Sequence, residues 1–199
     1  MKVTKIREDV WKFKGVGSVY LIKNGNKWIL IDSGDFEDRE FLKDEISRVV
    51  ALDKIDIVLL THLHRDHSAG LDLFPNARIY VSKEEFEDYL KDAKRFHFFS
   101  SDEVDRILKE KAEFLPEEIE GIKVLKVPGH TRGSVAFLDD IRKILFSGDS
   151  IFGGDIIGRS DFANSLPEEM EKSVEMLRSL VVNGGLSLCP GHGYWQDKY

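Results

Sequence analysis

Three histidines and one aspartate lie within six consecutive residues, in the segment HLHRDH at 62–67. In an extended segment, residues two positions apart point to the same side, so His62 and His64 can present two imidazoles to one metal ion. Asp66 and His67 face elsewhere, because the chain turns there into the next helix. This geometry suits a second ion close by. The segment therefore predicts a metal site, with room for a pair of ions.

Further residues of metal-binding types follow strand-like segments later in the chain. His130 lies in VPGHTRGS, Asp149 in LFSGDS and His192 in CPGHG. Small residues around them let the backbone approach closely. Five of the six histidines and two aspartates thus lie at strand-to-loop junctions, where binding residues tend to collect. A lone histidine is more often a surface or core residue, but this combination favours a metal centre.

The segments that carry these residues must meet in the fold, and the apolar pattern predicts the elements that position them. Alternating or continuous apolar residues predict strands at 4–10, 16–22, 27–31, 56–60, 122–127, 134–138, 143–146 and 186–189. Amphipathic spacing predicts helices at 38–50, 82–91, 102–112 and 165–181. The pattern S-x-x-E at Ser82 and again at Ser165 predicts capping boxes. Two runs of strands, each followed by helix, fit two sheets packed face to face with helices outside.

Composition and charge limit the partners of the chain. Its 199 residues, 42% apolar and 33% charged, are typical of one globular domain over residues 1–199. The net charge is −7 and the basic residues are scattered, so we expect no nucleic-acid partner. No apolar run is long enough to predict a signal peptide or a membrane span. Cys189 is the only cysteine, which excludes an internal disulfide and fits a cytoplasmic location.

The order of these motifs resembles that of the metallo-β-lactamase fold superfamily, with IDSGD at 31–35 upstream of HLHRDH. The resemblance covers nearly the whole chain. It implies a four-layer αββα sandwich, in which two mixed β-sheets lie face to face with helices on the outer faces, and a dinuclear metal site at one edge. By this resemblance, the first ion is held by His62, His64 and His130, the second by Asp66, His67 and His192, and both by a bridging Asp149.

Within the superfamily, the short length and the segment IGRSDF at 157–162 look like the compact glyoxalase II-like hydrolases, where GRTDxPGG commonly follows the bridging aspartate. This chain departs from that pattern with Ser160 for threonine and with Ala163 and Asn164 for Pro-Gly. We also expect no helical C-terminal domain of the kind with which full-length glyoxalase II holds glutathione. The resemblance therefore implies thioester chemistry without specifying glutathione. Penicillin hydrolysis is disfavoured, because the resembling lactamases carry no bridging aspartate at the position of Asp149.

Four further residues are candidates for lesser roles. Asp32 either supports the metal site, as the resemblance implies, or forms a turn after a strand. Arg159 either meets a substrate carboxylate or is a solvated or structural arginine. His97 lies in RFHFF, whose aromatic side chains either wall a substrate pocket or belong to the core. Cys189 is interpreted as a small residue packed in the final strand rather than as a ligand.

A pair of divalent cations predicts a hydrolytic mechanism. Two ions about 3.5 to 4 Å apart can share a water, lower its pKa and supply a bridging hydroxide. This hydroxide would attack an acyl carbon while Asp66 orients it or receives its proton. Two divalent cations, two carboxylates and one hydroxide sum to a formal charge of about +1, so we expect a small anionic substrate. The mixed imidazole and carboxylate shell suits zinc, iron and manganese alike, and we expect zinc first, with iron and manganese as alternatives.

The leading hypothesis is a thioester or ester hydrolase of the glyoxalase II-like kind. A phosphodiesterase or RNA-processing nuclease is an alternative, because two metals can also promote displacement at phosphorus, although the acidic charge disfavours it. Another is a mononuclear-iron persulfide dioxygenase, whose ligand pattern overlaps this one in the resembling group. A non-catalytic metal-binding or scaffold domain is the third. Metal content and a panel of substrates separate these functions.

Overall fold

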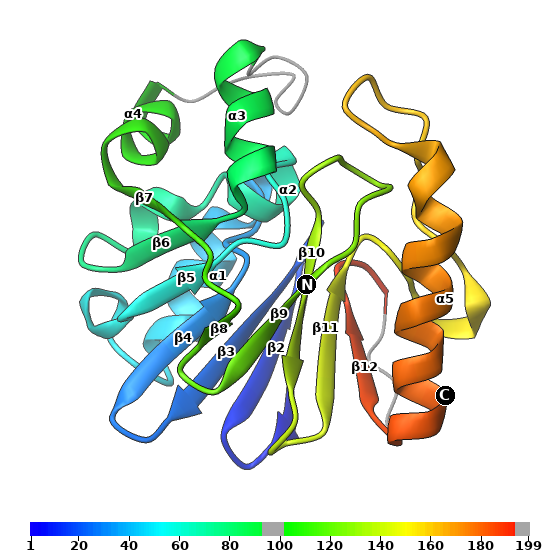
Figure 1. Ribbon diagram of the computed structural model, residues 1–199. Helices are drawn as coiled ribbons and strands as arrows, with labels where there is room; N and C mark the ends of the chain where they lie inside the picture. The colour runs from blue at the N-terminus through cyan, green and yellow to red at the C-terminus, as the bar shows by residue number, and fades with distance from the viewer. Residues whose placement is uncertain (93–101, 194–199) are drawn as a thin grey trace.

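Two β-sheets lie face to face in the computed structural model, which describes residues 1–92 and 102–193 (Figure 1). The larger sheet runs in sequence order through β1 (Lys2–Arg7), β2 (Val10–Lys14), β3 (Ser18–Asn24), β4 (Lys27–Ile31), β5 (Ile57–Leu59), β6 (Arg78–Val81) and β7 (Ala112–Phe114). The smaller sheet has the order β12 (Ser187–Pro190), β11 (Ile144–Gly148), β10 (Val135–Asp139), β9 (Ile122–Lys126) and β8 (Glu118–Ile119).

Alternation of side chains along the strands divides the core into layers. Ile29 and Ile31 of β4 pack between the sheets, together with Phe137 of β10. Leu30 and Ala136, each one residue away from these, belong to separate clusters on the outer faces. Because successive side chains of a strand point to opposite faces, a run of apolar residues supplies both the inter-sheet layer and an outer layer.

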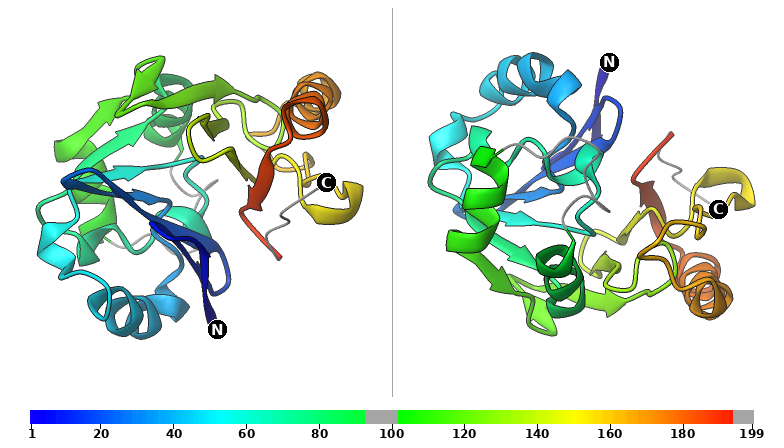
Figure 2. Two further views of the ribbon diagram at one scale, coloured as in Figure 1. Left: turned by 90° about the horizontal axis from the view of Figure 1, so that it is seen from below. Right: turned by 90° about the horizontal axis from the view of Figure 1, so that it is seen from above.

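Helices cover the outer face of each sheet. The outer cluster of the larger sheet includes buried residues of α1 (Arg39–Ser47), α3 (Lys83–Lys91) and α4 (Asp102–Lys111). The outer cluster of the smaller sheet includes the apolar stripe of α5 (Pro167–Gly184). Seen end on, α5 in orange and α1 in light blue lie on opposite sides of the paired sheets (Figure 2). The predicted αββα sandwich is confirmed. Within the described residues, no helix combines the length and apolar character that crossing a membrane requires.

The directions of the strands bring the predicted site segments to one edge. β4, β5 and β6 run parallel. In the other sheet, β9 and β11 both run antiparallel to β10, and β12 runs parallel to β11. HLHRDH follows β5 and leads into the short helix α2 (Arg65–Ser68). His130, Asp149 and His192 follow β9, β11 and β12, so carboxyl ends of strands from both sheets supply the candidate residues, as is common for ligand sites in α/β folds.

Several predicted boundaries are wrong. The strand predicted at 4–10 ends at Arg7, because the polar pair Glu8 and Asp9 forms a turn, and β2 beyond Val10 was not predicted. The strands β6, β7 and β8 were not predicted, since segments of two to four residues are too short to show a period. The last helix starts at Pro167 with Leu166 as its N-cap, so Ser165 does not cap it. Proline suits a first helical turn, because its missing N–H has no partner there.

Candidate metal centre

Seven side chains that are distant in the sequence converge at this edge of the sandwich. Their ligand atoms form three overlapping groups, and within each group these atoms lie within 4.8 Å of one another. The groups are His62, His64 and His130; His62, His67 and Asp149; and Asp66, His67 and His192. The first and third groups have the composition of the two ligand sets that the resemblance implies. The second joins them through Asp149.

The carboxylate of Asp149 lies between the two histidine sets. Its Oδ2 is 3.6 Å from Nε2 of His130 and 3.2 Å from Nε2 of His192, and its Oδ1 is 3.4 Å from Nε2 of His67. Oδ2 of Asp66 lies 3.1 Å from the same nitrogen of His192 and 3.5 Å from Nε2 of His67. Asp149 therefore contacts histidines of both sets, whereas Asp66 contacts histidines of one set only.

Four of the five histidines present the same ring nitrogen to the centre. Each uses Nδ1 for a protein hydrogen bond, which fixes the ring and directs Nε2 inward. These bonds run from His62 to Thr61 Oγ1 at 3.0 Å, from His67 to Asp32 Oδ2 at 2.8 Å, from His130 to the Arg159 carbonyl at 2.6 Å and from His192 to the Val16 carbonyl at 2.8 Å. His64 is turned the other way, since its Nδ1 lies 2.9 Å from Nε2 of His130.

Asp32 lies beneath the centre as a buried carboxylate. Its Oδ1 accepts the backbone N–H of Thr61 at 2.8 Å, and its Oδ2 accepts both the Thr61 hydroxyl at 2.9 Å and the imidazole N–H of His67. Through Thr61 it also reaches His62. Its backbone has a φ of 62°, in the left-handed region that few residues other than glycine adopt. These contacts are those of a supporting residue rather than of a solvent-exposed turn.

The buried polar atoms that face the centre fit a cation. Nε2 of His62, Nε2 of His67 and Oδ1 of Asp149 are shielded from solvent, and none of them makes a hydrogen bond with a residue in the described ranges. Leaving such atoms without a partner costs roughly 1 to 3 kcal/mol each, and buried polar groups are seldom left so. Imidazole and carboxylate are ligands that zinc, iron and manganese accept. The residues present therefore suit divalent cations.

Burial keeps the first histidine set neutral. It lowers the pKa of His62 well below the usual histidine range, lowers that of His64 to about 3 and lowers that of His130. The neighbouring imidazoles add to this effect for His62 and His64, because they disfavour a second positive charge. A neutral imidazole has the free lone pair that a metal ligand needs.

The second set combines carboxylates with imidazoles of high proton affinity. Burial opposes protonation of His67, yet the carboxylates of Asp149 and Asp66 raise its pKa well above the usual value. Burial likewise opposes protonation of His192, but hydrogen bonds to the same carboxylates raise its pKa to about 10. Both carboxyls remain ionised: burial favours their neutral forms, but the two imidazoles hold their pKa values below the usual range. Without a metal, the two protonated imidazoles therefore balance the two carboxylates, and a bound cation would take the place of the imidazole protons.

The loop that carries His192 is fastened to the first strands of the larger sheet. Ser18 N–H donates to the Gly191 carbonyl at 2.7 Å, and the Tyr20 hydroxyl donates to the Pro190 carbonyl at 2.6 Å. The ammonium of Lys12, which is only 2% exposed, donates to the Gly193 carbonyl at 2.8 Å. Contacts from two adjacent strands, β2 and β3, thereby fix the backbone on both sides of the histidine.

Replacing Lys12 with methionine should change how stability depends on pH. Burial lowers the pKa of Lys12 to about 8, so between that pH and the ordinary lysine value of 10.5 the unfolded chain binds more protons than the folded one. The free energy of unfolding of the wild type should therefore rise across this interval by about 2 to 3 kcal/mol relative to the variant. Urea denaturation of metal-free proteins between pH 7 and 10.5 measures it, and parallel curves would contradict the prediction.

The remaining predicted residues lie in different places. The backbone carbonyl of Arg159 bonds His130, whereas its guanidinium is 70% exposed and pairs with Asp161. Cys189 is buried between the sheets, as interpreted from the sequence. His97 lies outside the described residues. Two aromatic side chains that were not predicted border the centre: Phe162 has its ring centroid 5.0 Å from that of His64, and Phe152 lies 5.9 Å from His192.

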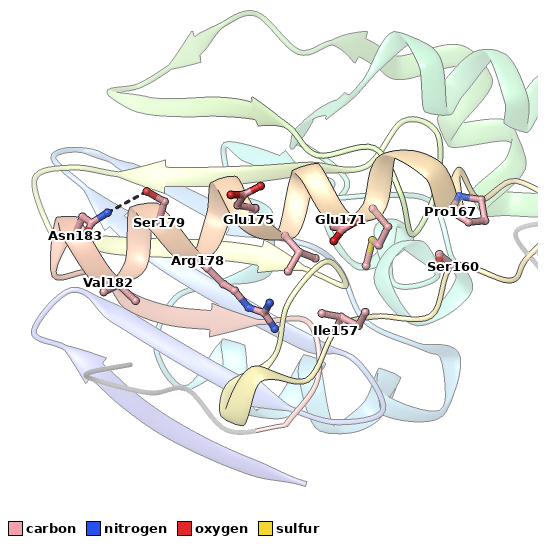
Figure 3. A pocket seen from close by; sticks show the side chains of 11 residues that line it. Ile157, Ser160, Pro167, Glu171, Glu175, Arg178, Ser179, Val182 and Asn183 are labelled. Carbon is pink, nitrogen blue, oxygen red and sulfur yellow. Dashed lines mark hydrogen bonds between the residues drawn. The ribbon is translucent and has the colours of Figure 1, made fainter.

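A groove of about 900 Å³ lies along α5, away from these seven residues (Figure 3). Figure 3 shows Arg178 and Val182 of α5 on one side and Ile157 and Ser160 of the preceding loop on the other. Its lining contains none of the clustered histidines or aspartates. The candidate site is therefore located by the chemistry of its side chains and not by the volume of a cavity.

The chain is similar in sequence to known hydrolases. Hydroxyacylglutathione hydrolase GloC of Haemophilus influenzae is 32% identical over 158 residues, which cover 74% of either chain. Acyl-coenzyme A thioesterase MBLAC2 of Homo sapiens is 25% identical over 211 residues, covering 94% of this chain and 73% of that protein. Several other hydroxyacylglutathione hydrolases are longer, and this chain spans 56% to 64% of their length.

A solved structure and a family match complete the comparison. The structure of TTHA1623 in a di-iron-bound form has a TM-score of 0.70 and 27% identity, with 93% of this chain and 92% of that chain covered. Residues 13–192 match the Metallo-beta-lactamase superfamily, a span that includes all of the clustered histidines and aspartates. The fold of this superfamily binds divalent metal ions. The chain therefore belongs to the metallo-β-lactamase superfamily.

Proposed function

We propose that the protein is a metal-dependent hydrolase of thioester or ester bonds in small anionic acyl compounds. The observation that carries the proposal is the pair of ligand groups, each of three side chains, joined by the carboxylate of Asp149. The names of GloC and MBLAC2 refer to hydroxyacylglutathione and acyl-coenzyme A, which are both thioesters. Because the two thiols differ, the likeness supports the bond to be cleaved rather than one carrier.

The residues of the centre have different roles in the proposed hydrolysis. Two divalent ions, when bound, lower the pKa of a shared water and polarise an acyl carbonyl. Neutral nitrogen donors come from His62, His64 and His130 on one side of the centre. On the other side, the carboxylates of Asp66 and Asp149 supply negative charge. Asp66 is ionised, and its side chain is 23% exposed, so it is accessible to accept a proton or to orient a polar reactant. Zinc is the first metal to test, and iron is the second.

Phe162 and Arg159, which lie beside the first histidine set, can distinguish anionic substrates from neutral ones. Phe162 contacts His64 and His130 edge to face, with ring centroids 5.0 and 5.5 Å apart. The guanidinium of Arg159 lies over the Phe162 ring, 4.7 Å from its centroid, and pairs with both oxygens of Asp161 at 2.9 Å. An acyl group held against Phe162 would bring a terminal carboxylate close to Arg159. We propose this arginine as the recognition group for the anion.

Metal analysis followed by a substrate panel tests the proposed function. The protein is purified, its zinc, iron and manganese are measured, and the protein loaded with each metal is assayed. The panel contains a lactoylated thiol, an acyl-coenzyme A, a lactone, bis-p-nitrophenyl phosphate and a glutathione persulfide with oxygen uptake recorded. We expect hydrolysis of the thioesters. Preferential cleavage of the phosphodiester would replace the proposal with a phosphodiesterase or nuclease. Oxygen uptake with one iron per chain would replace it with a persulfide dioxygenase, and inactivity on all substrates would favour a non-catalytic domain.

Replacing Arg159 with alanine should raise KM for a carboxylate-bearing thioester by about threefold to fivefold, because an exposed ion pair is worth at most about 1 kcal/mol. KM for a charge-neutral thioester of the same length should not change, and kcat should be preserved with both. Asp161→Asn is the matched control: it removes the competing carboxylate and should lower KM for the anion. Steady-state kinetics with both substrates measures these effects, and equal changes for the two thioesters would refute the assignment.

A further inference from the structure

Glu85 is a buried carboxylate in the first turn of α3, and its side chain is turned into the protein. The residue is 1% exposed. Oε1 accepts the backbone N–H of Leu63 at 2.9 Å, and Oε2 accepts the hydroxyl of Thr131 at 2.7 Å and the backbone N–H of Gly133 at 3.1 Å. Both carboxylate oxygens are thus engaged, by donors that lie 22 residues before Glu85 and 46 to 48 residues after it.

The donors belong to the two loops that carry the first histidine set. Leu63 lies between His62 and His64 in the loop after β5, which belongs to the larger sheet. Thr131 directly follows His130 in the loop after β9, which belongs to the smaller sheet. Glu85 therefore connects the two sheets at the point where three imidazoles must meet around one cation.

The packing around Glu85 leaves these loops little freedom. Gly133 lies so close to α3 that an added Cβ would be 2.2 Å from the Glu85 nitrogen and 2.5 Å from its Cα and Cβ. The Ser82 hydroxyl, which accepts the Glu85 N–H at 3.2 Å, also donates to the Gly133 carbonyl at 2.5 Å. The first turn of α3 and the loop after His130 are thus in direct contact, and the carboxylate extends from this contact to Leu63.

A purely helix-capping role does not require this arrangement. In a capping box, the glutamate would return to the backbone N–H of Ser82 at the surface of the protein. Here burial raises the pKa of Glu85 to about 7, although the three hydrogen bonds oppose that rise, so the buried carboxylate is costly to ionise. A helix with an exposed first turn could carry alanine or glutamine at this position, and no carboxylate would have to be buried. The side chain therefore has a task that lies outside α3.

We propose that Glu85 is a positioning residue for the first metal ion, which sets the separation between the loop of His62 and His64 and the loop of His130. This inference rests on the proposed metal centre. Its carboxylate does not bind the ion, because it contacts the residues next to the histidines and none of the histidines themselves. Supporting groups of this kind change metal affinity by about 10-fold to 100-fold when they are removed.

Glu85→Gln tests the inference with almost no change in shape. The amide offers one acceptor in place of two, so its NH₂ group must face either the Leu63 N–H or the Gly133 N–H, and one of these bonds is lost. The probe is Zn²⁺, titrated into metal-free protein against a chelator of known affinity at a temperature where all variants are folded. We expect two zinc ions per wild-type chain, and in the variant one of the two affinities about 10-fold to 100-fold weaker. The Tm of the metal-free proteins is recorded in parallel.

Matched variants separate positioning from general stability. Glu84→Gln removes the neighbouring exposed carboxylate, which pairs with Lys126, and should leave both zinc affinities unchanged. Thr131→Val removes one of the three donors and should weaken the same zinc ion by a smaller factor. It also provides the test if Glu85→Gln does not fold. A lower Tm with both affinities preserved would overturn the inference, since a merely structural residue behaves in this way.

The result is independent of the substrate. Unchanged zinc affinities in Glu85→Gln, with two ions bound, would overturn the positioning role and leave the proposed hydrolase intact. A wild-type protein that binds no zinc, iron or manganese would overturn both. A selective loss of one ion would support the positioning role even if the thioester panel proved negative, because binding is measured without any reaction.

Discussion

Asp149→Ala should leave about one divalent ion per chain and reduce turnover by about 10³-fold or more. The carboxylate lies 3.2 to 3.6 Å from ring nitrogens of three histidines, one in the first ligand set and two in the second. Its removal would therefore take an anionic donor from each of the two cations. A loss of about 4 kcal/mol in transition-state stabilisation, a fraction of what a metal pair supplies, corresponds to roughly this factor. Elemental analysis and kcat on the best thioester measure the two effects.

The control for this variant is an aspartate of the same sheet that lies outside the centre. Asp140, in the turn after β10, is 43% exposed and pairs with Lys123. Asp140→Ala should keep the metal content and the turnover of the wild type. If Asp149→Ala retained two ions, or lost less than about tenfold in turnover, the bridging assignment would be wrong and the two ligand sets would be independent.

The layer architecture and the candidate ligand residues at strand ends could be predicted because both depend on local patterns, whereas the division into two ligand sets came from the resemblance. HLHRDH places four donors within six residues, and the later histidines lie in short Pro-Gly contexts directly after apolar strands. Strand alternation in β4 and β10 is likewise readable from neighbouring residues. Because β9 and β11 run in the same direction, His130 and Asp149 reach the same edge of their sheet, whereas their approach to His62 depends on how the two sheets pack.

The supporting contacts could not be predicted, because they depend on backbone atoms and on long-range packing. The carbonyls of Val16 and Arg159 orient His192 and His130, and a carbonyl has no signature in the sequence. The two S-x-x-E patterns show the same limit. Ser82 caps α3 as predicted, but Glu85 extends away to the loops of the centre. Ser165 caps nothing and donates its hydroxyl to the His130 carbonyl at 2.6 Å.

These two cases have a common physical cause. A capping pattern in the sequence predicts the hydrogen bonds that a side chain could make within its own helix. Which bonds the side chain makes in the folded protein depends on what packs around it. When the first turn of a helix is packed against a loop with exposed peptide groups, the loop competes with the helix for the same side chain. Both helices start beside the loop of His130, so a polar side chain in the first turn of α3 and one just before α5 bond that loop instead.

Gly191→Ala is expected to have the second largest effect, because the residue before His192 leaves no room for a methyl group. A Cβ at this position would lie 2.1 Å from Oδ1 of Asp149 and 2.8 Å from Cε1 of His67. The backbone cannot move away easily, since its N–H donates to the Gly148 carbonyl at 2.8 Å and its carbonyl accepts the Ser18 N–H at 2.7 Å. The methyl group must therefore displace the carboxylate or the imidazole.

We expect this variant to fold, with a loss of about 1 to 3 kcal/mol in the free energy of unfolding of the metal-free protein, which is typical of overpacking. Metal content should fall below two ions per chain and turnover by about 100-fold, because a displacement of about 1 Å in a reacting group has effects of this size. Gly193→Ala is the control: its Cβ meets no atom of the described residues within 4 Å, although its φ of 80° makes the substituted backbone strained. Both glycines flank His192, but only at Gly191 would the added methyl group crowd Asp149 and His67. Equal losses of metal in the two variants would show that the loop, and not that crowding, controls the centre.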